Sequence, residues 1–254
     1  MATYKKRGDK PKNQAEKISQ IEQESTTAEV FSTLDEGASR TEAWVEKNQK
    51  AILILVGVVA ISVLGYLGYQ KLIQEPKESE AMNEMFQAQF YFEAALIASK
   101  KDSLFNLSLN GANGKFGFVD IIGNYGGTNA ANLATYYAGI AYLNTNKYQE
   151  AIQYLDKFKA NDTNVAPIAK GAIGDAFAQL EQPEEALKYY EKAASMSASE
   201  LTAPRFLLKA GITATTLGKE DLALKQFNAI IEKYPKSPEA EKAILYQGKA
   251  EAMK

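Results

Sequence analysis

The longest apolar stretch of the chain runs from Ala51 to Gln70, AILILVGVVAISVLGYLGYQ, and contains no charged residue. Lys50 and Lys71 close the run on its two sides. Twenty helical residues at about 1.5 Å each span about 30 Å, the thickness of the hydrocarbon core of a bilayer. Because lipid offers the backbone no hydrogen-bond partners, a spanning segment of this kind has to be a helix. The pattern predicts a single transmembrane helix over residues 51–71.

A buried core helix and a cleaved signal peptide are the two alternatives for this run. Core helices rarely carry Leu, Ile and Val on every face. The run is also too long for a signal peptide, starts too far into the chain and has no small-x-small cleavage site. Trp44 precedes the run, and Tyr66 and Tyr69 lie at its far end, where aromatic residues gather at membrane interfaces. Lys and Arg are more frequent on the N-terminal side, which favours a cytoplasmic N-terminus.

Residues 1–50 are polar and highly charged, so they cannot bury a core of their own. We expect a largely disordered cytoplasmic tail. Val30, Phe31 and Leu34 fall on one helical face and predict a short amphipathic segment within it. This segment either touches a partner or the membrane surface, or is a transient helix without a partner.

Apolar residues recur with a helical period through the rest of the chain, and small residues recur over longer intervals. Gly139, Gly174, Gly211 and Gly248 are 35, 37 and 37 residues apart, and Ala151, Ala186 and Ala223 follow in step. Periods of this size in a helical pattern indicate stacked helix pairs. We expect each glycine to lie where the two helices of a pair approach closely, against the helix that the alanine opens.

A further repeat lies upstream of the first glycine. The segment ending at Gly139 aligns without a gap with the segment ending at Gly248, with eight identities in 22 positions. The alignment predicts a helix over residues 118–125, preceded by a helix over residues 79–99, and a final unpaired helix over Pro238–Ala252 that caps the array. The glycine loop GANGKFG, residues 111–117, fits no phosphate-binding motif, and we expect it to be an irregular insertion at one edge of the array, overlapping a compact insertion over residues 102–115.

These residues resemble the tetratricopeptide repeat, over about residues 132–252. The small residue of helix A, its aromatic residue and the alanine of helix B appear as Gly139, Tyr142 and Ala151, as Gly174, Phe177 and Ala186, and in the third unit as Gly211 and Ala223 with the closing Pro235. The third unit departs from the family pattern, because Ala214 replaces the helix-A aromatic residue. The resemblance implies an all-α protein, with a single transmembrane helix followed by a tetratricopeptide-repeat-like α-solenoid of helix pairs over residues 79–254.

The resemblance also implies a binding groove, because set positions of each helix A line the concave face of such arrays. Its apolar character, with a few polar points, suits an extended or helical segment of a protein partner. The alternative is that part of this face packs on the helix over residues 79–99. The positions that correspond in this chain are Leu133, Tyr136, Ile140, Leu143, Asn144, Ile168, Asp175, Gln179, Arg205, Leu208, Ile212 and Thr216.

The amino-acid composition of the chain excludes several classes of function. The 254 residues include no His and no Cys, so the usual general base, the commonest metal ligand and thiolate chemistry are absent. We expect no catalytic residues, no metal site and no cofactor, and hence no enzyme. The net charge of −2 also argues against specific nucleic-acid binding, which needs a positive field.

The layout of tail, single span and short repeat domain is similar to that of the YfgM-type ancillary subunits of the bacterial Sec translocon. That resemblance implies a single-pass protein of the bacterial inner membrane, with a cytoplasmic N-terminus and a periplasmic repeat domain. It implies the SecYEG translocon, a PpiD-like periplasmic chaperone and secretory client proteins as partners in protein export. The alternative is an envelope scaffold that uses the same groove for a division, lipoprotein or secretion-apparatus partner.

Overall fold

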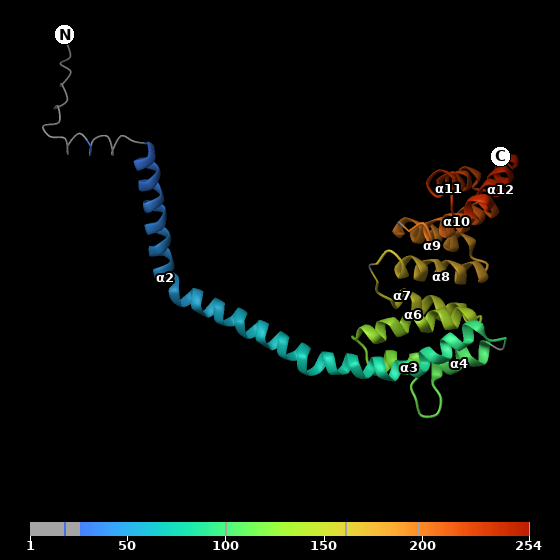
Figure 1. Ribbon diagram of the computed structural model, residues 1–254, viewed down its shortest axis with the longest axis horizontal. Helices are drawn as coiled ribbons and strands as arrows, with labels where there is room; N and C mark the ends of the chain where they lie inside the picture. The colour runs from blue at the N-terminus through green and yellow to red at the C-terminus, as the bar shows by residue number, and fades with distance from the viewer. Residues whose placement is uncertain (1–17, 19–25, 100, 161, 198, 254) are drawn as a thin grey trace, which may run out of the picture. The chain divides into compact units, whose positions relative to one another are not determined.

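The computed structural model describes residues 18, 26–99, 101–160, 162–197 and 199–253. Within these ranges the regular structure is entirely helical, apart from one isolated β-bridge between Ala112 and Lys115. This confirms the all-α prediction. The chain divides into two compact units, Met1–Tyr69 and Gln70–Lys254, which Figure 1 shows.

The first unit is described as one long helix, α2 (Thr26–Tyr69), which contains the apolar run. The large apolar side chains of the run are exposed, and Ile61 is 73% accessible. Among the described residues this is the one helix that is long and apolar enough to cross a membrane, and none of its most apolar window is buried in the protein. Lipid would solvate these side chains, whereas exposing them to water is unfavourable.

The helix α2 begins at Thr26, so the backbone is helical over residues 26–50, where the sequence predicts a largely disordered tail. A helix is costly to nucleate but gains one hydrogen bond for each residue added, so an apolar helix can extend into a polar flank. Residues 1–17 and 19–25 lie outside the described part of the chain, as do the side chains of Val30, Phe31 and Leu34.

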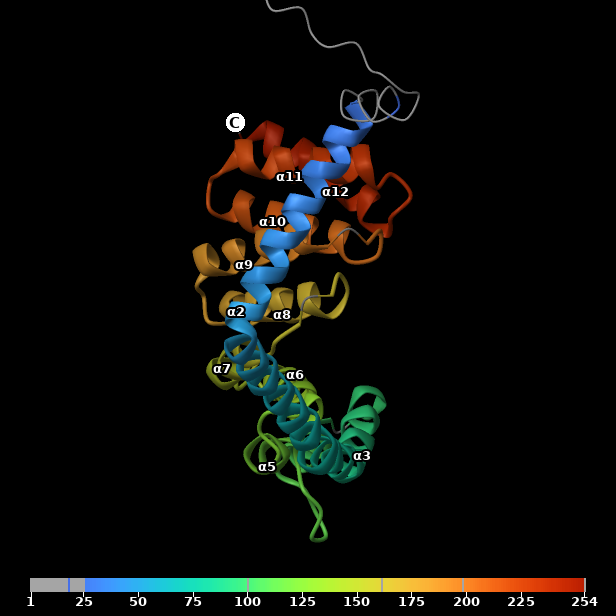
Figure 2. The ribbon, with the colours of Figure 1, turned by 90° about the vertical axis from the view of Figure 1, so that its left-hand side faces the viewer.

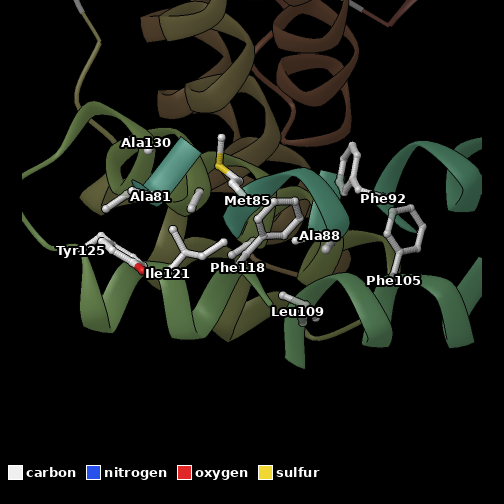
Figure 3. Packing of buried hydrophobic residues seen from close by; sticks show 14 of the residues in the cluster. Ala81, Met85, Ala88, Phe92, Phe105, Leu109, Phe118, Ile121, Tyr125 and Ala130 are labelled. Atoms are coloured by element: carbon white, nitrogen blue, oxygen red, sulfur yellow. The ribbon is translucent and has the colours of Figure 1, made fainter. Parts of the chain in front are cut away.

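The second unit opens with a turn of π-helix, η1 (Gln70–Gln74), and α3 (Glu75–Ile97). The helix α3 packs on α4 (Lys101–Asn110), α5 (Phe118–Asn124) and α6 (Asn129–Asn144). Figure 3 shows the buried cluster between them, in which the ring of Phe92 meets Phe105 and Phe118 edge-on, with centroids 5.5 and 6.1 Å apart. The helices predicted over residues 79–99 and 118–125 are therefore confirmed as α3 and α5.

The helix α4 lies largely within the compact insertion over residues 102–115, where the sequence analysis predicts no helix. Residues 101–110 are helical because Phe105 and Leu109, one turn apart, are fully buried against α3 and α5. Ser108 is buried beside them, and its hydroxyl donates to the Phe105 carbonyl at 2.8 Å. The irregular part is limited to the short loop from Gly111 to Gly117.

The first turn of α3 holds the loop that precedes α6. The Glu78 carboxylate accepts hydrogen bonds from the backbone N–H groups of Asn129 and Ala130, at 2.6 and 2.7 Å. A carboxylate at a helix N-terminus satisfies free N–H groups and complements the helix dipole. Lys77 Nζ adds a hydrogen bond to the Gly126 carbonyl at 3.0 Å. These contacts fix the N-terminal end of the repeat array on α3.

Six further helices follow α6, and each packs on the next one in the chain. Figure 2 shows them lying one above another from α6 to α12. They are α7 (Tyr148–Lys157), α8 (Val165–Gln179), α9 (Pro183–Met196), α10 (Ala203–Thr216), α11 (Glu220–Lys233) and α12 (Pro238–Ala252). The last of these confirms the predicted helix over Pro238–Ala252.

Three of the four recurring glycines, Gly139, Gly174 and Gly211, lie at the close approach within their helix pair, as predicted, but their partner is one turn beyond the alanine. A Cβ on Gly139 would overlap the Leu155 side chain, and a Cβ on Gly211 would overlap the ring of Phe227. A Cβ on Gly174 would lie 2.6 Å from Tyr190 Cε1. Each large residue comes four positions after the recurring alanine. The glycine therefore makes room for a large side chain.

The turn between the two helices of a pair also repeats. Asn146, Glu181 and Gly218 each precede the second helix of their pair and have φ angles of 61°, 59° and 65°. This left-handed conformation suits Gly and Asn, whereas a glutamate adopts it at some cost. The three units thus share one turn geometry although they differ in sequence.

Candidate functional site

Six apolar members of the predicted groove contribute mainly to packing between neighbouring helices. Leu133 and Ile140 on α6 pack on the cluster around α3, and Tyr136 packs on Ile173 and its neighbours. Ile168 and Ile212 lie against the C-terminal cluster, in which Leu208 is itself buried. These six side chains therefore contribute to packing, which was the alternative to lining a groove. Most of them pack between repeat units rather than on α3 alone.

Four other members of the predicted groove come together around one pocket of about 460 Å³. Leu143 and Asn144 reach it from the end of α6, and Asp175 and Gln179 reach it from α8. Residues that the groove prediction did not include complete the lining, namely Lys101, Asn146, Tyr148, Ala178, Tyr190 and Lys209. Arg205 and Thr216 are exposed on α10 and do not line this pocket.

Asp175 joins three helices at the floor of the pocket. Its Oδ1 accepts a hydrogen bond from the Tyr190 hydroxyl at 2.7 Å and another from Lys209 Nζ at 2.5 Å. The Lys209 ammonium also lies 5.5 Å from the centroid of the Tyr190 ring, a favourable cation–π distance. Because α8, α9 and α10 each supply one of these groups, the network fixes the shape of the pocket across two repeat units.

Burial raises the pKa of Tyr190, and the negative charge of Asp175 and their hydrogen bond raise it further. The phenol therefore stays protonated over the physiological range and donates to the carboxylate. The Asp175 and Lys209 side chains are each 30% exposed, so an incoming ligand can still reach this ion pair.

The rim of the pocket is rich in hydrogen-bond donors. Tyr148 Oη lies 2.9 Å from Asn146 Oδ1 and 3.4 Å from Gln179 Oε1. Because the hydroxyl has one proton, the shorter distance makes Asn146 Oδ1 the acceptor of its hydrogen bond. No described residue accepts a hydrogen bond from the Gln179 amide N–H₂ or pairs with Lys101. Gln179, Lys101 and Lys209 thus line the pocket with N–H groups that are free to donate hydrogen bonds.

The electrostatic character of the pocket follows from these groups. Two lysines and one aspartate line it, which leaves an excess of one positive charge. Such a site attracts backbone carbonyls and carboxylates, which accept hydrogen bonds from ammonium and amide groups. No group of three or more acidic residues that could hold a metal ion occurs in the part of the chain that the structure describes.

The repeat register contains the signal for this pocket. Asp175 follows its unit's glycine directly, at the position where the other units carry Ile140 and Ile212. Lys209 precedes its glycine by two residues, where the other units carry Tyr137 and Ala172. An acid and a base in adjacent units, at registers that the other two helix pairs fill with apolar or aromatic residues, indicate an ion pair between the two units.

A stack of antiparallel helices with a donor-rich pocket on the helix-A side defines a helical-repeat-like protein with a candidate polypeptide site. Comparison with protein families gives the next step. The chain belongs to the family described as "T7SS, ESX-1 secretion system protein EccA1, N-terminal domain", whose model matches residues 119–247, just over half of the chain. The matched range includes most of α5 and α12 and everything between them, and therefore the pocket except Lys101. No curated protein gives a significant match.

Proposed function

We propose that the chain is a membrane-anchored protein-interaction module that assists protein export. Its second unit holds an extended or helical segment of a partner against the helix-A face, and α2 anchors it in the membrane. The observation that carries the proposal is the donor-rich pocket around Asp175 and Lys209, with Leu143 as an apolar neighbour. Neither a cofactor nor catalysis is required.

The pocket chemistry suits polypeptide rather than a small apolar ligand. Gln179 and Lys101 offer donors to the carbonyls or carboxylate of a bound segment, while Asp175 keeps Lys209 in place. Hydrogen bonds to charged groups contribute about 1.5–3 kcal/mol each. A few of them, with one or two apolar anchors, are enough for specific capture of a short segment.

The first candidate partner is the SecYEG translocon together with a PpiD-like periplasmic chaperone, with secretory proteins as clients. The layout of tail, single apolar helix and repeat-like unit favours this assignment. A secretion-apparatus partner, bound through the same groove by an envelope scaffold, is the second candidate. The family description, which names a secretion-system protein, favours it.

The proposal includes a topology, with residues 72–254 in the periplasm and the N-terminus in the cytoplasm of a bacterial inner-membrane protein. The excess of Lys and Arg before the span supports it. A reporter that is active only after export, fused after Lys254, is expected to be active. Activity of a cytoplasmic reporter alone at that position would contradict the topology.

The partner assignment is tested by co-purification in mild detergent with two matched variants. Gln179→Glu keeps the shape of an exposed side chain but replaces its two donors with a negative charge, and Gln153→Glu makes the same change on the exposed face of α7, outside the pocket. Loss of one charge-assisted hydrogen bond corresponds to roughly tenfold weaker binding or more. We expect Gln179→Glu to lose SecYEG and the chaperone while Gln153→Glu retains them. Capture of secretion-apparatus components instead would favour the second candidate, and equal capture by both variants would remove the pocket from the function.

A further inference from the structure

The last helix of the array, α12, leaves open the face that its predecessors cover. Gly248 occupies the register of Gly139, Gly174 and Gly211, but a Cβ built on it would meet no atom within 4 Å. Leu245 is 73% exposed, whereas its counterpart one unit earlier, Leu208, is 8% exposed. The predicted helix over Pro238–Ala252 is thus present as α12, and its face with Gly248 and Leu245 carries the residues that form a contact in the earlier units.

A second apolar surface without a partner lies at the other end of the same unit. Met82, Phe86 and Phe90 recur every four residues along the face of α3 opposite its buried side, and the two phenylalanines are 69% and 56% exposed. The helix α3 thus carries apolar residues on two faces, although the described residues cover only one of them. Exposed apolar rows of this size mark interaction surfaces.

The two surfaces differ in side-chain size in a complementary way. On α12 the exposed residues Gly248 and Ala252 are four apart and carry no side chain or only a methyl group, and on α3 the exposed Phe86 and Phe90 are also four apart and carry large rings. Rows of this spacing pack into each other in the commonest class of helix–helix contact. The array itself provides the precedent, because Gly211 receives Phe227.

Charge supports the same pairing. Glu93 is exposed among the apolar residues of α3. On α12, Lys242, Lys249 and Glu241 are exposed beside Leu245, which leaves an excess of one positive charge on that face. The ion pairs found among the described residues include none of these four groups. Contact between the two surfaces would bring opposite charges together at the edge of an apolar interface.

We propose that the chain associates head to tail, with α3 of one molecule docked antiparallel on α12 of the next, so that Phe90 lies over Gly248 and Phe86 over Ala252. The contact is heterologous, so each molecule in a row uses one surface of each kind. It is separate from the pocket around Asp175, which lies between α8 and α10.

The absence of Cys permits a direct test with the full chain in mild detergent or lipid nanodiscs. One preparation carries Phe90→Cys and another carries Leu245→Cys. We expect a disulfide-linked dimer when the two are mixed and at least tenfold less from either one alone. Mixing Phe90→Cys with Lys225→Cys, an exposed position on α11, is the matched control and should give no dimer.

Gly248→Leu tests the contact at Gly248 without disturbing the fold, because the position is open and its φ is not left-handed. We expect this change to abolish the mixed crosslink while helicity is retained and the melting temperature is not lowered. Three results would overturn the proposal: no crosslink in the mixture, strong crosslinking of Leu245→Cys alone, which indicates a two-fold contact, or an unchanged crosslink with Gly248→Leu. Crosslinking of either position only to a different protein would equally reject a second copy as the occupant.

Discussion

Gly211 and Gly248 occupy the same register of the repeat in opposite surroundings, so the same substitution should affect them in opposite ways. Each lies inside a helix, where replacing Gly with Ala gains about 0.5–1 kcal/mol from the lower backbone entropy of the unfolded chain. At Gly248 the new methyl group meets nothing within 4 Å. We therefore expect Gly248→Ala to stabilise the unit by about 0.5–1 kcal/mol.

At Gly211 the methyl group would overlap the ring of Phe227, which is fully buried. Overpacking of this kind costs about 1–3 kcal/mol and outweighs the gain in helix propensity. The two variants should therefore differ by about 1–3 kcal/mol in the free energy of unfolding. For a unit of this size, 1 kcal/mol shifts the melting temperature by about 2–4 °C, so the two variants should melt roughly 2–12 °C apart.

The near-ultraviolet circular dichroism of the tyrosines is the appropriate signal for this comparison, because the one tryptophan, Trp44, lies in the other unit. Thermal melts of the full chain in one detergent would give both values under identical conditions. Equal shifts of the same sign would refute the assignment of Gly211 to the Phe227 contact, and with it the register of the whole array.

Three further predictions concern stability. Glu78→Gln removes the charge that caps α6 and should cost about 1–2 kcal/mol in urea unfolding, whereas Glu93→Gln on the exposed face of α3 should change little. Glu181→Gly should stabilise by up to about 1 kcal/mol, because glycine adopts the left-handed turn without strain; a lower melting temperature would contradict this. Burial, with a further contribution from Tyr154, raises the pKa of Tyr142 to about 12. Its protonated form is therefore favoured in the folded state, and its contribution to stability should be intact below about pH 10 and lost as the pH rises toward 12. Ultraviolet titration of a Tyr142→Phe variant should lack one phenol that ionises near pH 12.

The repeat could be predicted from sequence because its small residues are imposed by geometry. Gly139, Gly174 and Gly211 each lie where a Cβ would collide with the facing helix, so the period of the glycines is the period of the helix pairs. The helix α4 could not be recognised in this way. Its Asn and Ser residues are typical of loops, and its burial depends on Phe92 and Phe118, which are distant in sequence.

The groove was predicted residue by residue from a resemblance, and the structure divides those residues into two groups. Apolar positions such as Tyr136 and Ile212 are partly used for packing between units, which a pattern within one helix does not reveal. The polar positions Asp175 and Gln179 meet in a pocket whose other members, Lys209 and Tyr190, come from different helices. The pairing of Asp175 with Lys209 across two units is the part that depends on the three-dimensional arrangement.

The most direct test of the proposed function is site-specific photo-crosslinking from Gln179 in intact cells. Gln179 is exposed in the pocket and has no packing role, and Lys192, exposed on α9 outside the pocket, serves as the matched position. We expect a photoreactive side chain at residue 179 to capture a component of the export machinery, SecYEG, a PpiD-like chaperone or a secretion-apparatus subunit, and the same side chain at residue 192 to capture none. Equal capture from both positions, or capture from residue 192 alone, would contradict the assignment of the pocket as the binding site.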